Sequence, residues 1–133
     1  MLNAAQKVAK KSTCRRKHGA LIMRGGNVQA RGYNTYKEHA TRGGGPLQTL
    51  HAEAAAIRAA ETAGTELRGA TIVVVRIPGA GGSQMSKPCR DCARLIESKG
   101  IKKVIYTDET GDLIQEYTSG GRSFRKRRMS EKP

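Results

Sequence analysis

The sequence predicts one α/β domain, and three observations support this prediction. Residues 50–63 are rich in Ala and are followed by Gly64, a pattern typical of a helix with a glycine terminator. Residues 71–75 form a nearly continuous β-branched run, as in a central strand covered on both faces. The chain of 133 residues is long enough for one hydrophobic core and too short for two ordinary domains.

The N-terminal part predicts a helix and two strands. Residues 2–11 are helix formers with Ala and Val at helical spacing. Residues 19–23 and 28–33 flank a turn-rich link of hairpin length, so we expect two antiparallel strands. Residues 34–48 include three consecutive glycines and a proline and show no periodic pattern, which predicts a loop in front of a site.

The C-terminal part predicts a second major helix and a hairpin. Pro88 stands where a first helical position is expected, and the helix should run to about Ser98. Residues 104–107 predict a strand that is followed by Gly111 and a short alternating stretch at 113–117. Because Gly111 can supply the left-handed residue of a short loop, we expect an antiparallel hairpin rather than another helix.

The net charge of +14 lies at the two ends of the chain. Residues 1–37 hold nine Lys or Arg and no acidic residue, and residues 120–133 hold six basic residues against Glu131 alone. We therefore expect a domain at residues 1–119 and a basic, flexible tail at residues 120–133. Positive charge attracts phosphorylated small molecules and nucleic acids, and it does not decide between them.

No segment of the sequence has the properties of a membrane span or a signal peptide. The apolar stretches are all shorter than the roughly 20 residues that cross a bilayer. The N-terminus lacks an apolar run followed by a small-residue cleavage site. We expect a cytoplasmic protein without a membrane partner.

Two short motifs at predicted helix starts provide a metal-ligand set. Cys89 and Cys92 are three residues apart, so they share one face of a helix, and the positive end of that helix favours their thiolates. His51 stands at the start of the Ala-rich helix. Two thiolates and one imidazole suit zinc, and three protein ligands leave a fourth position for water, as in catalytic sites. We predict one Zn²⁺ held by His51, Cys89 and Cys92.

Glu53 is the predicted catalytic residue. His51 and Glu53 are two residues apart and do not face each other along a helix, but both can reach a point beyond its end. This requires two helix N-termini to converge on one metal. Zinc lowers the pKa of bound water towards about 7. A nearby carboxylate can take the proton of that water and deliver it to a ring nitrogen and a leaving amine.

These residues match the cytidine deaminase superfamily, whose signature combines H-x-E with P-C-x-x-C. Ser12-Thr13-Cys14-Arg15-Arg16, Gly19-Ala20 and Gly32-Tyr33-Asn34 are similar to the deoxycytidylate deaminase branch. The resemblance covers roughly residues 10–107. It implies a cytidine deaminase-like three-layer α/β/α sandwich with a mixed sheet of about five strands.

The resemblance also nominates residues for the substrate. In the deoxycytidylate branch the Asn of the Gly-aromatic-Asn turn contacts the nucleoside, which points to Asn34. We expect Ala52 and Ser86 to take part in substrate binding as well. Family members commonly assemble, so a homo-oligomer is expected.

Two features depart from the deoxycytidylate branch. A C-terminal antiparallel hairpin resembles deaminases of free cytidine, whereas the deoxycytidylate branch runs its last strand parallel. The loop at residues 77–87 replaces the common Thr-x-x-Pro-Cys approach to the cysteines.

Three hypotheses follow for the function. The first is zinc-dependent hydrolytic deamination of a cytosine nucleoside or nucleotide, which gives the uracil product and ammonia. The second is deamination of cytosine or adenine in single-stranded DNA or RNA along the basic ends, although aromatic residues for base stacking make up only 4% of the chain. The third is a non-catalytic zinc domain that binds nucleic acid, and Glu53 argues against it because a structural site needs no such carboxylate.

Three further residues receive ordinary structural interpretations. We expect His18 and His39 to be surface or loop histidines, because neither has a partner at metal-ligand spacing. Cys14 is expected to be a small buried hydrophobic residue.

Overall fold

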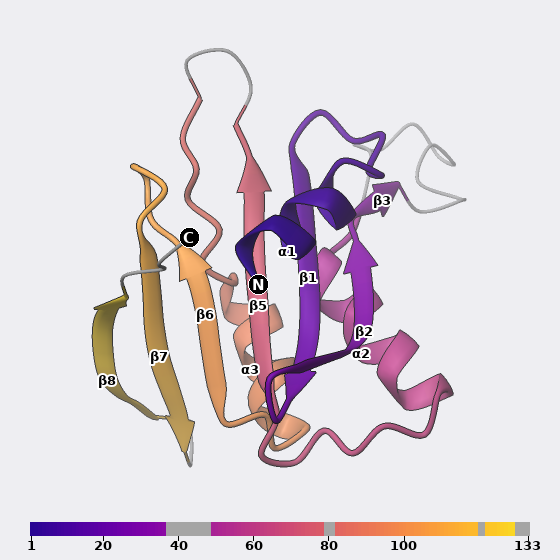
Figure 1. Ribbon diagram of the computed structural model, residues 1–133, viewed down its shortest axis with the longest axis vertical. Helices are drawn as coiled ribbons and strands as arrows, with labels where there is room; N and C mark the ends of the chain where they lie inside the picture. Colours follow the sequence, from indigo (N-terminus) through magenta and orange to yellow (C-terminus); the bar gives the residue numbers. More distant parts are fainter. Residues whose placement is uncertain (37–48, 79–81, 120–121, 130–133) are drawn as a thin grey trace.

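The computed structural model describes residues 1–36, 49–78, 82–119 and 122–129 (Figure 1). Its helices are α1 (Leu2–Ala9), α2 (Ala52–Thr62) and α3 (Arg90–Ser98). Its strands are β1 (Lys17–Arg24), β2 (Asn27–Tyr33), β3 (Thr35–Tyr36), β4 (Thr49–Leu50), β5 (Thr71–Ile77), β6 (Lys103–Thr107), β7 (Leu113–Ser119) and β8 (Arg122–Met129). Most of the predicted loop at 34–48, including His39, lies outside the described residues.

The main sheet is mixed, as predicted. Its order is β2-β1-β5-β6-β7-β8, and a separate two-stranded sheet joins β3 to β4. The β5–β6 pair is parallel, and the other neighbours in the main sheet are antiparallel. The five expected strands are all present, and the predicted hairpin is confirmed as β6–β7, with Gly111 at φ 92° in its turn.

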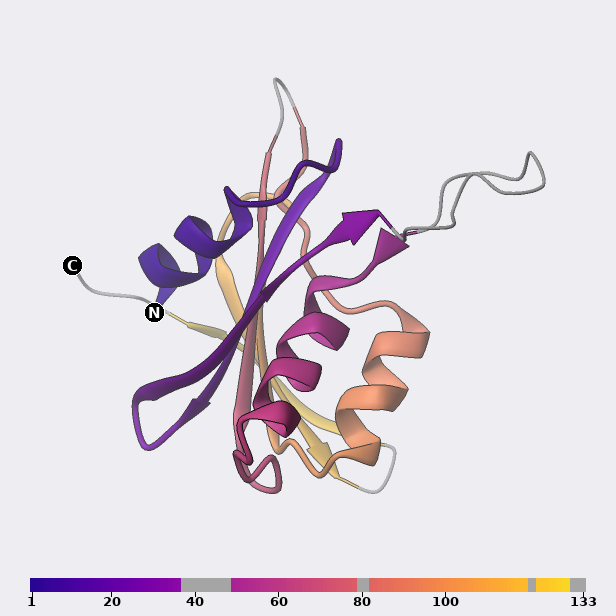
Figure 2. The same cartoon turned by 90° about the vertical axis from the view of Figure 1, so that its right-hand side faces the viewer.

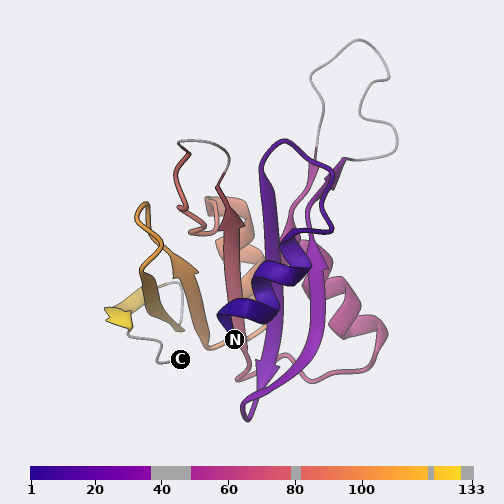
Figure 3. The ribbon, with the colours of Figure 1, turned by 45° about the horizontal axis from the view of Figure 1, so that its top comes forward.

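The helices cover the sheet from both sides, which gives the expected three layers. Figures 2 and 3 show α1 on one face and α2 with α3 on the other. Along β5, Ile72 and Val74 join the core under α2, whereas Val73 and Val75 join the core under α1. This alternation explains the continuous β-branched run, because the central strand buries both of its faces. None of the helices in the described part of the chain has the length and apolar character that crossing a membrane requires.

Gly32 brings α2 unusually close to the sheet. A Cβ at this position of β2 would lie 2.3 Å from the Ala56 nitrogen and 2.7 Å from the Ala52 oxygen. The helix backbone therefore rests directly on the strand, which a larger side chain prevents. Because Ala52 begins α2, this contact also fixes the position of His51 immediately before it.

Two expectations differ from the structure at the ends of elements. Pro88 lies outside α3, which begins at Arg90 with Cys89 as its N-cap. Within the predicted tail, the backbone at Arg122–Met129 pairs with β7 as strand β8. Ladder hydrogen bonds join backbone groups, so a segment with few apolar residues can still pair at a sheet edge. The division into a domain and a flexible tail stays a prediction.

Candidate metal centre and active-site cavity

Two helix N-termini meet at one place, as the motif spacing predicts. His51 is the N-cap of α2 with φ −70° and ψ 150°, and Cys89 is the N-cap of α3 with φ −67° and ψ 171°. The two helices contact each other. Neither side chain makes a capping hydrogen bond to its own helix. Both side chains are therefore directed to a common point instead of to backbone N–H groups.

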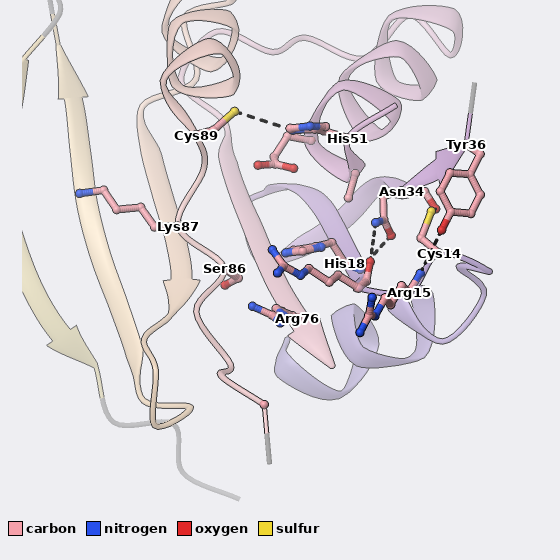
Figure 4. Close-up of a pocket in the computed structure, with 14 residues that line it drawn as sticks. Cys14, Arg15, His18, Asn34, Tyr36, His51, Arg76, Ser86, Lys87 and Cys89 are labelled. Carbon is pink, nitrogen blue, oxygen red and sulfur yellow. Dashed lines mark hydrogen bonds between the residues drawn. The ribbon is translucent and has the colours of Figure 1, made fainter. Parts of the chain in front are cut away.

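The predicted ligand atoms form a compact cluster at this point. His51 Nδ1 lies 3.2 Å from Cys92 Sγ and 3.7 Å from Cys89 Sγ. One ligand atom from each of the three residues falls within 4.8 Å of the others. His51 and Cys89 are exposed, whereas Cys92 is buried. Figure 4 shows Cys89 and His51 directed toward each other on the same side of the cavity.

The chemistry of this cluster fits a divalent cation. Burial raises the pKa of the Cys92 thiol, and the nearby Glu53 and Cys89 raise it further. Three groups that can carry negative charge thus lie together, and a bound cation would relieve their repulsion. One imidazole and two sulfurs are a donor set that suits zinc. The residues present therefore fit the predicted Zn²⁺.

Glu53 lies beside this cluster with its side chain almost fully enclosed. Its exposed fraction is 5%, and burial raises its pKa above the ordinary value. Opposing effects from its own backbone N–H, His51 and Cys92 do not cancel that increase. A buried carboxyl group with a raised pKa is suited to hold and release a proton near neutral pH.

Both the cluster and Glu53 open onto one large cavity of about 830 Å³. This volume is in the range of small-molecule binding sites. The described residues that line it are Cys14, Arg15, Arg16, His18, Asn34, Tyr36, His51, Ala52, Glu53, Arg76, Gly82, Ser86, Lys87 and Cys89. The site residues predicted from sequence all line the cavity except Cys92.

Comparison with known proteins identifies the family. The cytidine and deoxycytidylate deaminase zinc-binding region matches residues 1–108 of this chain. The chain belongs to this family. The deaminase resemblance seen in the motifs is thereby confirmed. No curated protein matches the chain by sequence.

Solved structures of deaminases share the fold of this family member. Cytidine deaminase from Burkholderia pseudomallei is 26% identical, with a TM-score of 0.66 over 86% of this chain and 87% of that protein. The dCMP deaminase of cyanophage S-TIM5 in its apo form is 25% identical, with a TM-score of 0.63 over 82% of this chain and 80% of that protein. The phage protein in complex with dCMP and dUMP is 24% identical, with a TM-score of 0.63 over 80% of this chain and 76% of that protein, a likeness that shows the fold.

In this deaminase family member, the Asn34 amide fastens the chain entering β1. The His18 backbone N–H donates to Asn34 Oδ1 over 2.9 Å, and Asn34 Nδ2 donates to the Arg16 carbonyl over 2.6 Å. The Ser12 hydroxyl donates to the Asn34 carbonyl over 2.8 Å. The amide keeps one N–H and one lone pair for a further partner. Its substrate contact stays a prediction, and its position in the cavity wall is compatible with it.

Ser86 and Ala52 occupy buried positions in the wall. The Ser86 hydroxyl donates to the Val74 carbonyl over 2.7 Å and accepts from the Thr107 N–H over 2.7 Å. This hydroxyl attaches the segment before Cys89 to the middle of β5 and to the end of β6. Ala52 is 1% exposed and lies next to His51. The predicted substrate contacts of both residues remain untested by this geometry.

Sequence reasoning missed the residues at the opposite end of the cavity. His18, expected at the surface, is only partly exposed and lines the cavity together with Arg76. The two are partners in the β1–β5 register. One signal was present in the sequence: Arg76 directly follows four buried residues of a central strand, and ligands of α/β sheets lie beyond the carboxyl ends of such strands.

Proposed function

We propose that this chain is a zinc-dependent hydrolytic deaminase that converts a cytosine nucleoside or nucleotide into the uracil product and ammonia. The observation that carries this proposal is the His51, Cys89 and Cys92 cluster, with ligand atoms within 4.8 Å, beside the buried Glu53 at a large cavity. Family membership and the likeness to solved cytidine and dCMP deaminases support it.

His51, Cys89 and Cys92 would hold the zinc ion. When bound, zinc acts as a Lewis acid that lowers the pKa of a coordinated water to near neutrality. The His51 Nδ1 atom faces both sulfurs, so its lone pair serves as the ligand and the proton of the neutral ring stays on Nε2. Two short helices hold the three ligands, and Gly32 sets the position of one of these helices on the sheet.

Glu53 would move the protons of the reaction. Its carboxylate would accept one proton from the attacking water and give it to a ring nitrogen of the base. It would then accept the second proton from the hydroxyl group now attached to the base carbon and give it to the leaving amine, while that carbon forms the carbonyl of the product. One water is consumed and one ammonia is released for each base converted. Because burial raises the pKa of Glu53, the protonated form needed for donation is more accessible than in an exposed glutamate.

Substrate profiling tests this function directly. Purified protein is incubated with cytidine, deoxycytidine, their monophosphates and triphosphates, and a cytosine-containing oligonucleotide, and ammonia release is measured. We expect turnover of free nucleosides or nucleotides. Turnover of the oligonucleotide alone would replace this assignment with a polynucleotide deaminase.

Three variants separate metal binding from proton transfer. Cys89→Ser should lose both zinc and activity, whereas Glu53→Gln should keep zinc and lose at least about 100-fold in kcat. Cys14→Ser is the matched control, because Cys14 lies outside the ligand cluster and should leave the zinc content unchanged. A metal-free Cys89→Ser protein with full activity would refute the site.

A further inference from the structure

The end of the cavity away from His51 and Cys89 is strongly cationic. Arg15, Arg16 and Arg76 line it, and Figure 4 shows Arg15 and Arg76 on the side opposite Cys89 and His51. None of these three arginines forms a salt bridge with any residue the structure describes. Among the described lining residues, Glu53 is the one carboxylate, and it belongs to the other end. Within the part of the chain that the structure describes, no carboxylate compensates this positive charge.

Arg76 is the least satisfied of these groups. Its Nε is buried and has no hydrogen-bond partner within the described part of the chain. Buried polar groups in folded proteins are normally paired, because an unpaired N–H loses its contact with water without replacement. The missing acceptor therefore points to a ligand group that enters the cavity.

We propose that this arginine end is a phosphate subsite, so that the substrate is a cytosine nucleotide, and that Arg76 selects it over the nucleoside. This inference rests on the proposed function, which places the base at the zinc end. A guanidinium matches the geometry of a phosphate and binds two of its oxygens at once. The cavity of about 830 Å³ has room for a base, a sugar and a phosphate.

The neighbours of Arg76 hold the subsite in place. His18 lies opposite Arg76 in the β1–β5 register. Burial lowers the pKa of His18, and the Arg76 charge lowers it further. The neutral imidazole adds hydrogen-bonding capacity without a second buried charge beside Arg76. Asn34 binds the backbone of both Arg16 and His18, so the segment that carries these side chains is fixed before a ligand arrives.

The remaining cation of the cavity is already engaged elsewhere. Lys87 Nζ lies 3.4 Å from a Glu116 carboxylate oxygen. This ion pair reduces its availability to a ligand. The phosphate-binding charge therefore belongs to Arg76 of β5 and to Arg15 and Arg16, which directly precede β1.

The antiparallel orientation of β7 is compatible with a nucleotide substrate. An antiparallel last strand resembles deaminases of free cytidine, but β7 is separated from β5 by β6. The groups that a substrate meets are those lining the cavity, and three of them are arginines without a salt bridge to any described residue. The cavity wall, rather than the strand direction, indicates the substrate class.

The ratio of two specificity constants tests the proposal. We expect kcat/KM for CMP or dCMP to exceed that for the matching nucleoside, and Arg76→Met to lower this ratio about 10- to 100-fold, as loss of a charge-assisted hydrogen bond predicts. Arg76→Lys should retain part of the preference. Arg31→Met removes the same charge from an exposed position of β2 outside the cavity, so it should leave the ratio unchanged. An Arg76→Met ratio equal to that of the unmodified protein overturns the proposal.

Direct binding separates this inference from the proposed activity. The zinc-loaded protein is titrated calorimetrically with dUMP and, separately, with inorganic phosphate. Arg76-dependent binding of both ligands supports the subsite even if no substrate is deaminated, in which case the proposed function fails by itself. Equal binding to the unmodified protein and Arg76→Met overturns the subsite while leaving the deaminase proposal intact. If Arg76→Met does not fold by circular dichroism, Arg76→Gln takes its place in both measurements.

Discussion

His51 and Cys89 occupy the same position, the N-cap, in two neighbouring helices, and His51 Nδ1 lies 3.7 Å from Cys89 Sγ. An N-cap residue has extended backbone angles, so its side chain is free of the helix surface. Each helix therefore presents one ligand beyond its end, and Cys92 completes the set from the first turn of α3. The site therefore depends on the packing of both helices.

Removing the metal should destabilise the protein. A ligand that binds only the folded state at 1,000 times its Kd contributes about 4 kcal/mol of stability. We expect chelation to lower the Tm by about 10 °C, given the usual few degrees per kcal/mol for a domain of this size. Thermal unfolding with and without a chelator measures the change. Cys14→Ser should show the same decrease, and Cys92→Ser should show almost none.

Glu53→Gln should stabilise the metal-free protein at neutral pH. Burial raises the folded pKa of Glu53 above its ordinary 4.5, so the folded state binds this proton more tightly than the unfolded state. Ionisation therefore costs stability as the pH rises above about 4.5. The neutral Gln avoids this cost, and its advantage should disappear below about pH 4.

Urea unfolding in the presence of a chelator at two pH values checks the direction of this change in stability. The difference in free energy of unfolding between Glu53→Gln and the unmodified protein should be large at about pH 7.5 and small at about pH 4. Glu109→Gln is the control, because Glu109 is exposed in the turn between β6 and β7 and forms no salt bridge with any described residue. An equal gain at both pH values would show that ionisation of Glu53 is not the cause.

His18 should make the fold sensitive to mild acid. Its folded pKa lies below the ordinary 6.5 because burial, and then Arg76, disfavour the imidazolium. As the pH falls below about 6.5, the unfolded chain takes up this proton first, so the free energy of unfolding decreases. His18→Gln should show a smaller loss of stability between about pH 7.5 and 5.5, measured by urea unfolding. An unchanged pH dependence would assign the effect to other groups.

The parts of the structure that the sequence predicts depend on local spacing. The His51 and Cys89 motifs, the buried run of β5 and the Gly111 turn each involve residues close together in the chain. The pairing of His18 with Arg76 depends instead on the register between β1 and β5, which no local pattern specifies. This is why the sequence predicts the His51 and Cys89 end of the cavity in detail and does not predict the pairing at the arginine end.

The departures at element ends have similar physical causes. Pro88 is compatible with a first helical position and also with the residue before an N-cap, so its presence alone does not fix where α3 begins. The basic sequence at Arg122–Met129 lacks an apolar pattern, yet β8 forms because β7 offers backbone partners. Hydropathy describes side chains, so it does not predict a strand that forms by backbone pairing at the edge of a sheet.

Gly32→Ala should weaken both the fold and the metal site. The new methyl group would meet the Ala56 nitrogen at 2.3 Å, so α2 must move away from β2. We expect a loss of about 1–3 kcal/mol, as in other overpacked sites, together with weaker zinc binding because His51 precedes the displaced helix. Unfolding and zinc competition measurements test the two effects. Gln29→Ala, at an exposed position of the same strand, should change neither.

Ser86→Ala should separate loop attachment from catalysis. The hydroxyl is 3% exposed, donates to the Val74 carbonyl and accepts from the Thr107 N–H, so its removal leaves two buried backbone groups without this partner. We expect a loss of about 1–3 kcal/mol in stability. The segment that Ser86 attaches leads into Cys89 and forms part of the cavity wall. We therefore expect KM to rise, while the zinc content is retained. Ser98→Ala, which removes an exposed hydroxyl at the end of α3, is the matched control. A Ser86→Ala protein with unchanged stability and raised KM would instead assign the hydroxyl to direct substrate contact.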